Sequence, residues 1–310
     1  MKKKTIVVAL GRNAFGKSFP EQKKSIIKAA NAIADLVEDK YKVVITHSNG
    51  PQIGMLHRAM TEFSRLDRAY TGASMSVCGA LSQGYIGYDL QNAIRTALLD
   101  RGIFKTVSTI ITQVRVDPFD PAFQNPTKVI GRIMTKEEAD AEIRKGNYVT
   151  EENGGYRRIV ATPKPIDIYE IDAVKALVEA DQIVIACGGG GIPVLEQGTS
   201  IQGASAVIEK DLASEKLADM LDADLLVFLT EAKKVALNFG TEQEKPLDQL
   251  TAADAKRYIE EGQFPLPTML PKIEASINFV VKKENRKAII GHLNDARECL
   301  LGLNGTVITP

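Results

Sequence analysis

Short runs of apolar residues alternate along this chain with longer segments in which apolar side chains recur every three or four positions. The short runs predict strands that are buried on both faces, and they are Thr5–Leu10, Lys42–Thr46, Thr106–Gln113, Gln182–Cys187, Asp224–Thr230, Lys287–Ile290 and Thr306–Ile308. The longer segments predict helices, which run from Ser18 to about Lys40, within Gly72–Gly102, and over Ile171–Ala180, Leu212–Leu221, Ala252–Gly262 and Met269–Lys282. This alternation predicts an α/β fold with a mainly parallel central sheet that helices cover on both faces.

Residues 117 to about 165 break this rhythm. The segment contains Pro118, Pro121 and Pro126, a short predicted helix near Thr135–Lys145, and a strand-like run at Tyr156–Ala161. An irregular insertion of this length indicates a small subdomain that protrudes from the main sheet. It is either a lid over a binding site or a surface hairpin without a direct role.

The helical region within Gly72–Gly102 is rich in small residues. They are Gly79, Ala80, Ser82, Gly84 and Gly87. Small side chains allow another element to approach closely. They indicate either tight packing inside the subunit or a contact between subunits.

Three loops of small residues follow predicted strands. Gly11 follows the first strand, Ser48-Asn49-Gly50 follows the second, and Gly188–Gly191 follows Gln182–Cys187. Ligands of open parallel sheets bind beyond the carboxyl ends of the strands, so we expect the three loops to form one anion site. Four consecutive glycines are costly to order. We expect close approach of the backbone to a ligand, rather than a tight turn, to require them.

The first loop also matches a phosphate-binding pattern. Residues Gly11–Ser18 fit G-x-x-x-x-G-K-S/T between a predicted strand and a predicted helix. In that motif the lysine and the serine open the helix, whereas here Pro20 lies in the first turn of a helix that Ser18 is expected to cap. We therefore expect Lys17 to lie outside the nucleotide site. A short glycine turn, Gly11–Ala14, whose amides face an anion, is the preferred interpretation.

Composition narrows the classes of function. The 310 residues carry 39 basic and 39 acidic side chains, and this net charge of zero gives no attraction to nucleic acid or to an acidic membrane surface. The apolar run after the basic start Met1–Lys4 has six residues, too few for a signal peptide or a membrane span. Cys78, Cys187 and Cys299 are far apart and lack metal-ligand spacing, which predicts buried free thiols in a reducing cytoplasm.

Seven motifs follow one another along the chain: HSNGPQIG, ALSQGYIGYDLQNA, DPAFQNPTKVIG, ACGGGGIPV, AVIEKDLASEKLA, LNFG and MLPKIEAS. Together they resemble the motifs of the carbamate kinase family within the amino acid kinase superfamily. The resemblance runs from Thr5 to Ile308. It is therefore far more specific than the match to the phosphate-binding loop.

The resemblance implies an open αβα sandwich of the amino acid kinase type that forms a homodimer. It implies an N-terminal acceptor-binding lobe, residues 1–205, which includes the protruding subdomain at about 117–165, and a C-terminal nucleotide-binding lobe, residues 206–310. The reaction would be reversible phosphoryl transfer between ATP and carbamate in arginine metabolism, which in catabolism runs from carbamoyl phosphate and ADP to ATP. Mg²⁺ would be carried on the phosphates, without a direct protein ligand.

The same resemblance implies the residues of the site. The catalytic residues would be Lys128 in the protruding subdomain, the phosphate-facing Lys210 and Lys272, and Asp211, which would hold those two lysines in place. The acceptor and phosphate would contact Gly11, Arg12, Asn13, Ser48, Asn49, Gly50, Gly189 and Gly190. The nucleotide would contact Lys210, Thr230, Val235, Asn238, Met269 and Lys272. Such a set suits phosphoryl transfer, where positioning and charge neutralisation dominate and an anionic acceptor needs no general base.

Several positions depart from the family pattern, and most lie in the acceptor loops. Arg12 and Ser48 stand where the family has glycine, Val129 where it has proline, and Pro267-Thr268 where it has glycine and serine. A left-handed backbone at position 12 would make a β-carbon there costly by roughly 1–2 kcal/mol. Arg12 either folds into the pocket, where it blocks carbamate or favours a different acid, or turns outward and leaves ordinary activity.

These departures lead us to expect weak or altered activity, which Arg12→Gly would raise. Two alternatives remain at this point. One is a kinase for another small acid, since a guanidinium can bind an oxyanion through two hydrogen bonds. The other is a catalytically silent paralogue that binds nucleotide or a partner enzyme.

Overall fold

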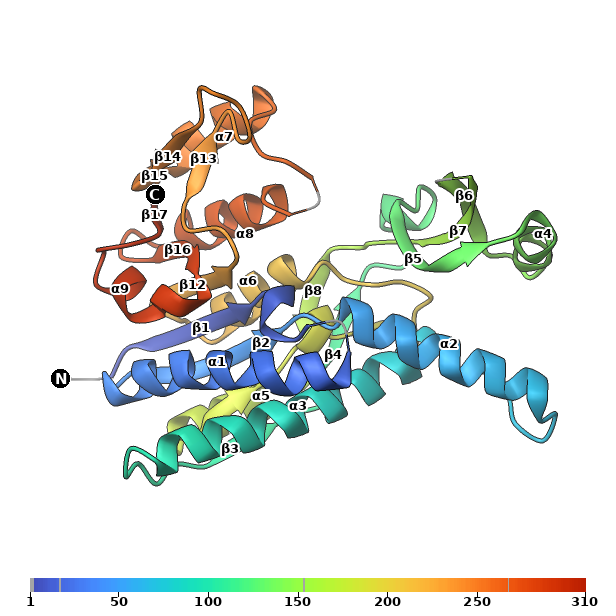
Figure 1. Cartoon of the computed structure of the whole chain (residues 1–310), viewed down its shortest axis with the longest axis horizontal. Coiled ribbons are helices and arrows are strands. Elements are labelled where there is room, and N and C mark those ends of the chain that lie inside the picture. The colour runs from blue at the N-terminus through green and yellow to red at the C-terminus, as the bar shows by residue number, and fades with distance from the viewer. Residues whose placement is uncertain (1–2, 17, 153, 267) are drawn as a thin grey trace.

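The computed structural model describes residues 3–16, 18–152, 154–266 and 268–310, and its largest feature is an eight-stranded sheet (Figure 1). The strand order is β15-β17-β16-β12-β1-β2-β9-β3. The parallel strands are β1 (Thr5–Leu10), β2 (Lys42–His47), β3 (Val107–Thr109), β9 (Ile183–Ile185), β12 (Leu225–Thr230) and β16 (Lys287–His292). At one edge β17 (Thr306–Thr309) runs antiparallel to β16 and parallel to β15 (Gln249–Thr251). The expectation of a mainly parallel sheet is confirmed.

Helices cover both faces of this sheet. One face carries α1 (Phe19–Glu38), α3 (Met75–Leu99) and α9 (Ala296–Leu300), and the other carries α5 (Ile171–Glu179), α6 (Lys210–Met220) and α8 (Leu270–Val280). Strand β1 shows why, since Val7 and Ala9 enter one hydrophobic core while Ile6, Val8 and Leu10 enter the other. A strand that is apolar on both faces needs a helical layer on each side. The αβα sandwich is thus confirmed.

A second sheet has four strands in the order β11-β10-β4-β8. They are β4 (Gln113–Val116), β8 (Pro165–Ile168), β10 (Ile192–Gln197) and β11 (Ser200–Gly203). The prediction of one strand over Thr106–Gln113 is wrong, because the chain leaves the main sheet after β3 and joins this second sheet at β4. The side chain of Gln83 on α3 bonds to both the N–H and the carbonyl of Thr112 in between, at 2.7 and 3.2 Å. The Thr112 carbonyl also accepts from the Ile192 N–H of β10 at 2.9 Å, so this residue is already bonded to the second sheet.

A small subdomain protrudes from the body of the molecule (Figure 1). It contains the three-stranded sheet β5-β7-β6, with β5 (Lys128–Met134), β6 (Tyr148–Glu152), β7 (Gly155–Val160) and α4 (Lys136–Arg144). Below it in Figure 1 lies α2 (Gly50–Leu66), which projects from the body and buries only Gln52 among its residues. The expected protruding subdomain is therefore present, and its position beside α2 is a feature that the sequence did not indicate.

The start of α1 follows the capping pattern. Ser18 Oγ accepts a hydrogen bond from the Glu21 N–H at 3.4 Å, and a proline lies in the first turn. The helix therefore begins after Ser18, as predicted. A phosphate-binding loop would need the lysine and the serine to open the helix, so this start does not fit that interpretation. Lys17 and Pro267 lie outside the described residues. Helix α6 begins at Lys210, two positions before the predicted start at Leu212.

The small residues of α3 pack inside the subunit at two positions at least. A β-carbon on Gly87 would lie 2.3 Å from Thr109 Cγ2 on β3, and one on Gly79 would lie 3.6 Å from Ile192 Cγ1 on β10. Ser82 is fully buried. Helix α3 therefore sits close to both sheets because these side chains are small.

The C-terminal part adds a hairpin and one more helix. The hairpin consists of β13 (Val235–Leu237) and β14 (Lys245–Leu247), and α7 (Ala252–Glu260) follows β15. Ala252 and Ala255 of α7 join the same hydrophobic core as α6 and α8. In Figure 1 these elements lie together at the upper left, well apart from the protruding subdomain at the upper right.

Candidate active site

Two lysines share one buried carboxylate at the start of helix α6. Lys210 Nζ lies 2.6 Å from Asp211 Oδ1, and Lys272 Nζ, from the first turn of α8, lies 2.9 Å from Asp211 Oδ2. The Asp211 side chain is only 3% exposed. Lys272 also donates to the carbonyl of Thr268 at 2.8 Å. Both carboxylate oxygens are therefore engaged, and each holds one ammonium group in place.

Burial and charge together set the protonation of this cluster. Burial alone would raise the pKa of Asp211, but Lys210 and Lys272 bring it below its usual value. Burial lowers the pKa of Lys210, and the adjacent Asp211 opposes that shift. The cluster joins two cationic side chains to one anion, so its excess positive charge suits a phosphate ligand.

This cluster opens onto a cavity of about 1,020 Å³. The cavity is bounded by the start of α6, by α2, by β5 of the protruding subdomain and by the loops after β1, β2 and β9. The expected site residues on its wall are Gly11, Arg12, Ser48, Asn49, Gly50, Lys128, Gly189, Lys210, Asp211 and Lys272. Tertiary structure thus brings three loops and three lysines from distant parts of the chain to one space.

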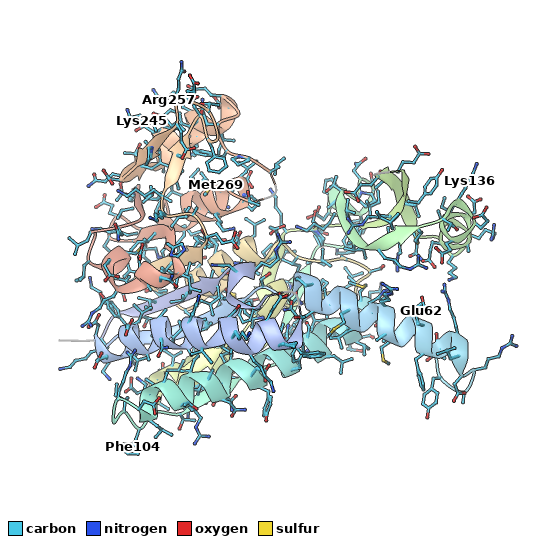
Figure 2. All side chains as sticks on the ribbon, viewed as in Figure 1. Glu62, Phe104, Lys136, Lys245, Arg257 and Met269 are labelled. Atoms are coloured by element: carbon cyan, nitrogen blue, oxygen red, sulfur yellow. The ribbon has the colours of Figure 1, made fainter. Side chains whose placement is uncertain are left out.

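Other expected site residues do not line this cavity. They are Asn13, Gly190, Thr230, Val235, Asn238 and Met269. Val235 is fully buried. Figure 2 shows Met269 among the C-terminal helices, whereas Glu62, which does line the cavity, lies on α2. Apart from Lys210 and Lys272, the residues expected around the nucleotide therefore lie off this cavity wall.

The four glycines after β9 pack against the protein itself. A β-carbon on Gly188 would lie 2.3 Å from His47 Nε2, one on Gly189 would lie 2.0 Å from Asn49 Nδ2, and one on Gly190 would lie 2.4 Å from the Ile208 carbonyl oxygen. Gly189, Gly190 and Gly191 also have positive φ angles of 66°, 97° and 82°. The glycine run is accounted for by this packing and by the backbone conformation. Since Gly189 and Gly191 also line the cavity, the expected close approach to a ligand stays a prediction.

The loop after β2 is fixed by buried polar groups. Asn49 Nδ2 donates to Ser82 Oγ on α3 at 2.8 Å. His47 is 1% exposed, and its Nε2 has no hydrogen-bond partner among the described residues. Burial, with a smaller contribution from the charge of Lys210, lowers the pKa of His47 to about 4 against the opposing effect of its hydrogen bond to the Ser48 carbonyl. His47 is thus a neutral imidazole beneath the glycine loop at neutral pH.

Arg12 lies on the cavity wall with an exposed side chain. It begins a short 3₁₀ helix, η1 (Arg12–Ala14), and its φ is not positive. The left-handed backbone on which a cost at position 12 would depend is therefore not adopted by Arg12. Gly11 is the position where a β-carbon would collide, 2.8 Å from Asn13 Oδ1. Within the described part of the chain, the guanidinium of Arg12 has no hydrogen-bond or ion-pair partner, while its carbonyl accepts from the Phe15 N–H at 3.1 Å.

Lys128 reaches the cavity from the protruding subdomain. It is the first residue of β5, and its Nζ donates to Glu209 Oε2 at 2.8 Å. Glu209 immediately precedes Lys210, so this contact joins the subdomain to the start of α6. The side chains of the two residues are 37% and 24% exposed.

Sequence reasoning missed several titratable residues of the cavity wall. They are His57, Arg58 and Glu62 on α2, Arg132 and Arg157 in the subdomain, and Glu209. Arg58 and Glu62 are four positions apart on a helix that directly follows the loop Ser48-Asn49-Gly50, which places them on the same face. That helical spacing was the available signal. The subdomain residues carried no comparable signal, because the docking of the subdomain is a tertiary property.

Two further observations bear on ligands and location. Over residues 3–16, 18–152, 154–266 and 268–310, no group of three or more His, Cys, Asp or Glu side chains is arranged to hold a metal ion. In the same residues, no helix combines the length and the apolar character needed to cross a membrane.

Comparison with known proteins was made against families, curated relatives and solved structures. The model of the amino acid kinase family matches residues 4–292. The chain is 52% identical over 306 residues to Carbamate kinase-like protein YqeA of Escherichia coli (strain K12), covering 98% of this chain and 99% of that protein. It is 48% identical over 310 residues to Carbamate kinase of Clostridium perfringens (strain 13 / Type A), with coverage of 98% and 99%.

A solved structure is also similar over nearly the whole chain. It is carbamate kinase from Giardia lamblia bound to AMP-PNP, with a TM-score of 0.94 and 34% sequence identity. The match covers 99% of this chain and 98% of that one. The similarity therefore includes the protruding subdomain as well as the main sheet.

Proposed function

The chain belongs to the amino acid kinase family, and from this premise we propose that it is a carbamate kinase, which transfers a phosphoryl group reversibly between ATP and carbamate. The observation that carries the proposal is the Lys210–Asp211–Lys272 cluster, which opens on a cavity shared with the loops after β1, β2 and β9. Relatives that share nearly the full length support the same activity. A paralogue without activity is not favoured, because the charged residues that the reaction needs are all present.

The proposed mechanism relies on charge and position. Carbamate is already an anionic nucleophile, so no residue has to remove a proton from it. Lys210 and Lys272 would neutralise the charge that spreads over the phosphoryl oxygens in transit, with Asp211 fixing both ammonium groups beforehand. Because Asp211 orients them before the substrate arrives, little reorganisation is needed during the reaction.

We propose that the acceptor binds on the N-terminal side, within a lobe of residues 1–205, and the nucleotide on the C-terminal side, within residues 206–310. Gly11, Arg12, Ser48, Asn49, Gly50, Gly189 and Lys128 supply the acceptor side of the cavity wall. Asn13 and Gly190 support these loops from behind, since Asn13 Oδ1 lies close to Gly11 and Gly190 packs on Ile208. The subdomain would cover the acceptor, which favours the interpretation as a lid over that of a surface hairpin.

The nucleotide base and ribose would extend from Lys210 and Lys272 toward the C-terminal hairpin. Thr230 is the last residue of β12 and lies beside Gly11, while Asn238 and Met269 lie further along the C-terminal part. The buried Val235 would act there by shaping the backbone. AMP-PNP bound to the Giardia lamblia enzyme supports a nucleotide as substrate. Mg²⁺ would be carried by the phosphates, since both carboxylate oxygens of Asp211 bind lysines.

We further propose that the protein is a homodimer and acts in arginine metabolism in the cytoplasm. The exposed face of α3 carries Val77, Leu81 and Tyr88, exposed by 48%, 44% and 66%. A row of exposed apolar side chains along one helix suits a contact with a second copy. Three buried free cysteines suit a reducing compartment. Analytical ultracentrifugation would test the dimer, since the proposal requires a species of twice the 33.7 kDa chain mass.

A coupled assay tests the activity directly. Purified protein is given ADP, Mg²⁺ and carbamoyl phosphate, and ATP formation is followed through hexokinase and glucose-6-phosphate dehydrogenase. We expect turnover of roughly 1–100 per second, the usual range for kinases. The Asp211→Asn variant gives the background. ATP formation no faster than this background would rule out the proposed function.

A further inference from the structure

We propose that Glu209 is a positioning residue, which holds the Lys128 ammonium at the start of α6 and thereby docks the protruding subdomain over the cavity. The kinetic part of this inference rests on the proposed function. The docking part concerns the free protein alone.

The placement of Glu209 needs an explanation, because an acid on the wall of a phosphate cavity repels the ligand. It occupies the N-cap position of α6, where a carboxylate commonly accepts a hydrogen bond from the first turn of the helix. Its side chain makes no such bond and lines the cavity instead, where Oε2 accepts from Lys128 Nζ at 2.8 Å. The carboxylate is therefore used for Lys128 rather than for the helix.

This ion pair has no equivalent elsewhere in the subdomain. Arg132, Arg157 and Lys145 pair with Glu138, Glu152 and Glu142, all inside the subdomain. Over residues 128–152 and 154–160, the contact between Lys128 and Glu209 is the only ion pair to the rest of the described chain. The docking of the subdomain on the α6 side therefore depends on it more than on any other charged contact.

A second contact couples the same two segments. The chain that leaves the subdomain at Ala161 forms a parallel bridge with Ala206, and the Val207 N–H donates to the Ala161 carbonyl at 3.0 Å. Residues 206–209 then lead directly into Lys210. A displacement of the subdomain would therefore be transmitted to the segment that begins the lysine cluster.

The pair is compatible with a bound substrate. An ammonium group has three N–H donors, and Glu209 uses one of them, so two remain for oxygens of the acceptor or the phosphate. A lysine without such a contact must lose the freedom of its long side chain when the substrate recruits it. Glu209 reduces that loss in advance. Removal of its carboxylate should therefore weaken the binding of the substrate that Lys128 contacts, while the nucleotide is affected little.

The docking is tested by hydrogen–deuterium exchange of the free protein. In Glu209→Ala we expect amides of β5 to exchange at least threefold faster, with those of β1 and β12 unchanged. Glu209→Gln keeps an acceptor oxygen and should give an intermediate rate. The control is Glu196→Ala, which removes another half-exposed ion pair, with Arg115 on the second sheet. Unchanged exchange in β5 of Glu209→Ala would overturn the docking.

Kinetics test the positioning. Glu209→Ala should raise the KM for carbamoyl phosphate three- to tenfold, tenfold being about 1.4 kcal/mol, and leave the KM for ADP within twofold. In a Lys128→Met background the same change should have no further effect. A charge exchange, Lys128→Glu with Glu209→Lys, should restore slow exchange in β5 but not the KM.

Two kinetic outcomes would overturn the positioning role. One is an equal rise of both KM values, which would indicate a structural role only, and the other is an undiminished effect in the Lys128→Met background. If the wild type proves inactive in the coupled assay, the proposed function fails by itself. The exchange experiment then still decides whether Glu209 docks the subdomain.

Discussion

The two sides of the cavity handle positive charge in opposite ways. At the start of α6, Lys210 and Lys272 are largely buried, and each is bound to an oxygen of Asp211. On the loop after β1, Arg12 is exposed, and its guanidinium has no hydrogen-bond or ion-pair partner in the described part of the chain. The same kind of charge is thus fixed on one side and free on the other.

A buried cation and an exposed cation serve different functions in a site. A buried cation held by a carboxylate is oriented before the ligand arrives and stabilises charge in transit, whereas an exposed one is screened and contributes mainly to binding. The fixed side should therefore govern stability and turnover. The free side should govern affinity for the acceptor, with smaller effects.

The largest effect is expected from Asp211→Ala. It leaves two largely buried ammonium groups without their partner, which typically costs about 3–5 kcal/mol. Urea denaturation followed by circular dichroism should show this loss in the free energy of unfolding. The matched control is Asp254→Ala on α7, whose exposed pair with Arg257 should contribute below about 1 kcal/mol. Equal losses of unfolding free energy in the two variants would show that the buried charges are no more stabilising than an exposed pair.

Next in size are the single substitutions Lys210→Ala and Lys272→Ala. Each should lower kcat about 100-fold, or roughly 2.7 kcal/mol, because removal of one preorganised contact to the transition state has that effect. Nucleotide affinity measured by calorimetry should change much less. Lys256→Ala, at an exposed position of α7, serves as the control. Unchanged turnover in either variant would mean that this lysine does not act on the phosphoryl group.

The third effect is a pH dependence that comes from His47. Its pKa is about 4 in the folded protein and near 6.5 when unfolded, so the unfolded chain binds more protons between these values and stability falls as the pH is lowered. From pH 7.5 to 5.5 the loss attributable to His47 should be about 1.4 kcal/mol. Asp211, with its lowered pKa, stays charged over this range.

The measurement for His47 is urea denaturation at both pH values in wild type and in His47→Gln. The variant should lose about 1.4 kcal/mol less than wild type over this range, whatever its absolute stability. The same pH slope in both proteins would show that the buried imidazole is not the source.

The smallest effect is expected at Arg12. Since its φ is not positive, Arg12→Gly should relieve no strain, which removes one reason for the gain in activity expected from the sequence. Arg12→Ala and Arg12→Gly should both raise the KM for carbamoyl phosphate about threefold and leave kcat within twofold, as for loss of one exposed charge of up to about 1 kcal/mol. Arg12→Lys should keep most of the affinity. Faster turnover in Arg12→Gly would instead show that the guanidinium obstructs the acceptor.

Much of the fold was readable from the sequence because its signals are local. Thr5–Leu10 is apolar at nearly every position, which requires burial on both faces, and Ser18 with Pro20 marks the beginning of α1. The boundary errors have a common cause. Thr106–Gln113 resembles a single strand because no glycine, proline or charged residue interrupts it, while Gln83, distant in sequence, bonds to Thr112 where the chain passes between the two sheets.

The sequence by itself determined the alternation of strands and helices and the family, and it predicted three lysines that the structure places on the cavity wall. Each of these depends on residue types at fixed spacing. Tertiary structure alone decided how the charges of the lysines are partnered. Asp211 bonds to Lys272, 61 residues away in sequence, and Glu209 bonds to Lys128, 81 residues away. The parallel sheet and the packing of the subdomain bring these pairs together. It also decided that Arg12 is unstrained and that the glycines after β9 pack on His47 and Asn49. The physical reason is that burial and ion pairing depend on distances in space, which spacing along the chain does not fix.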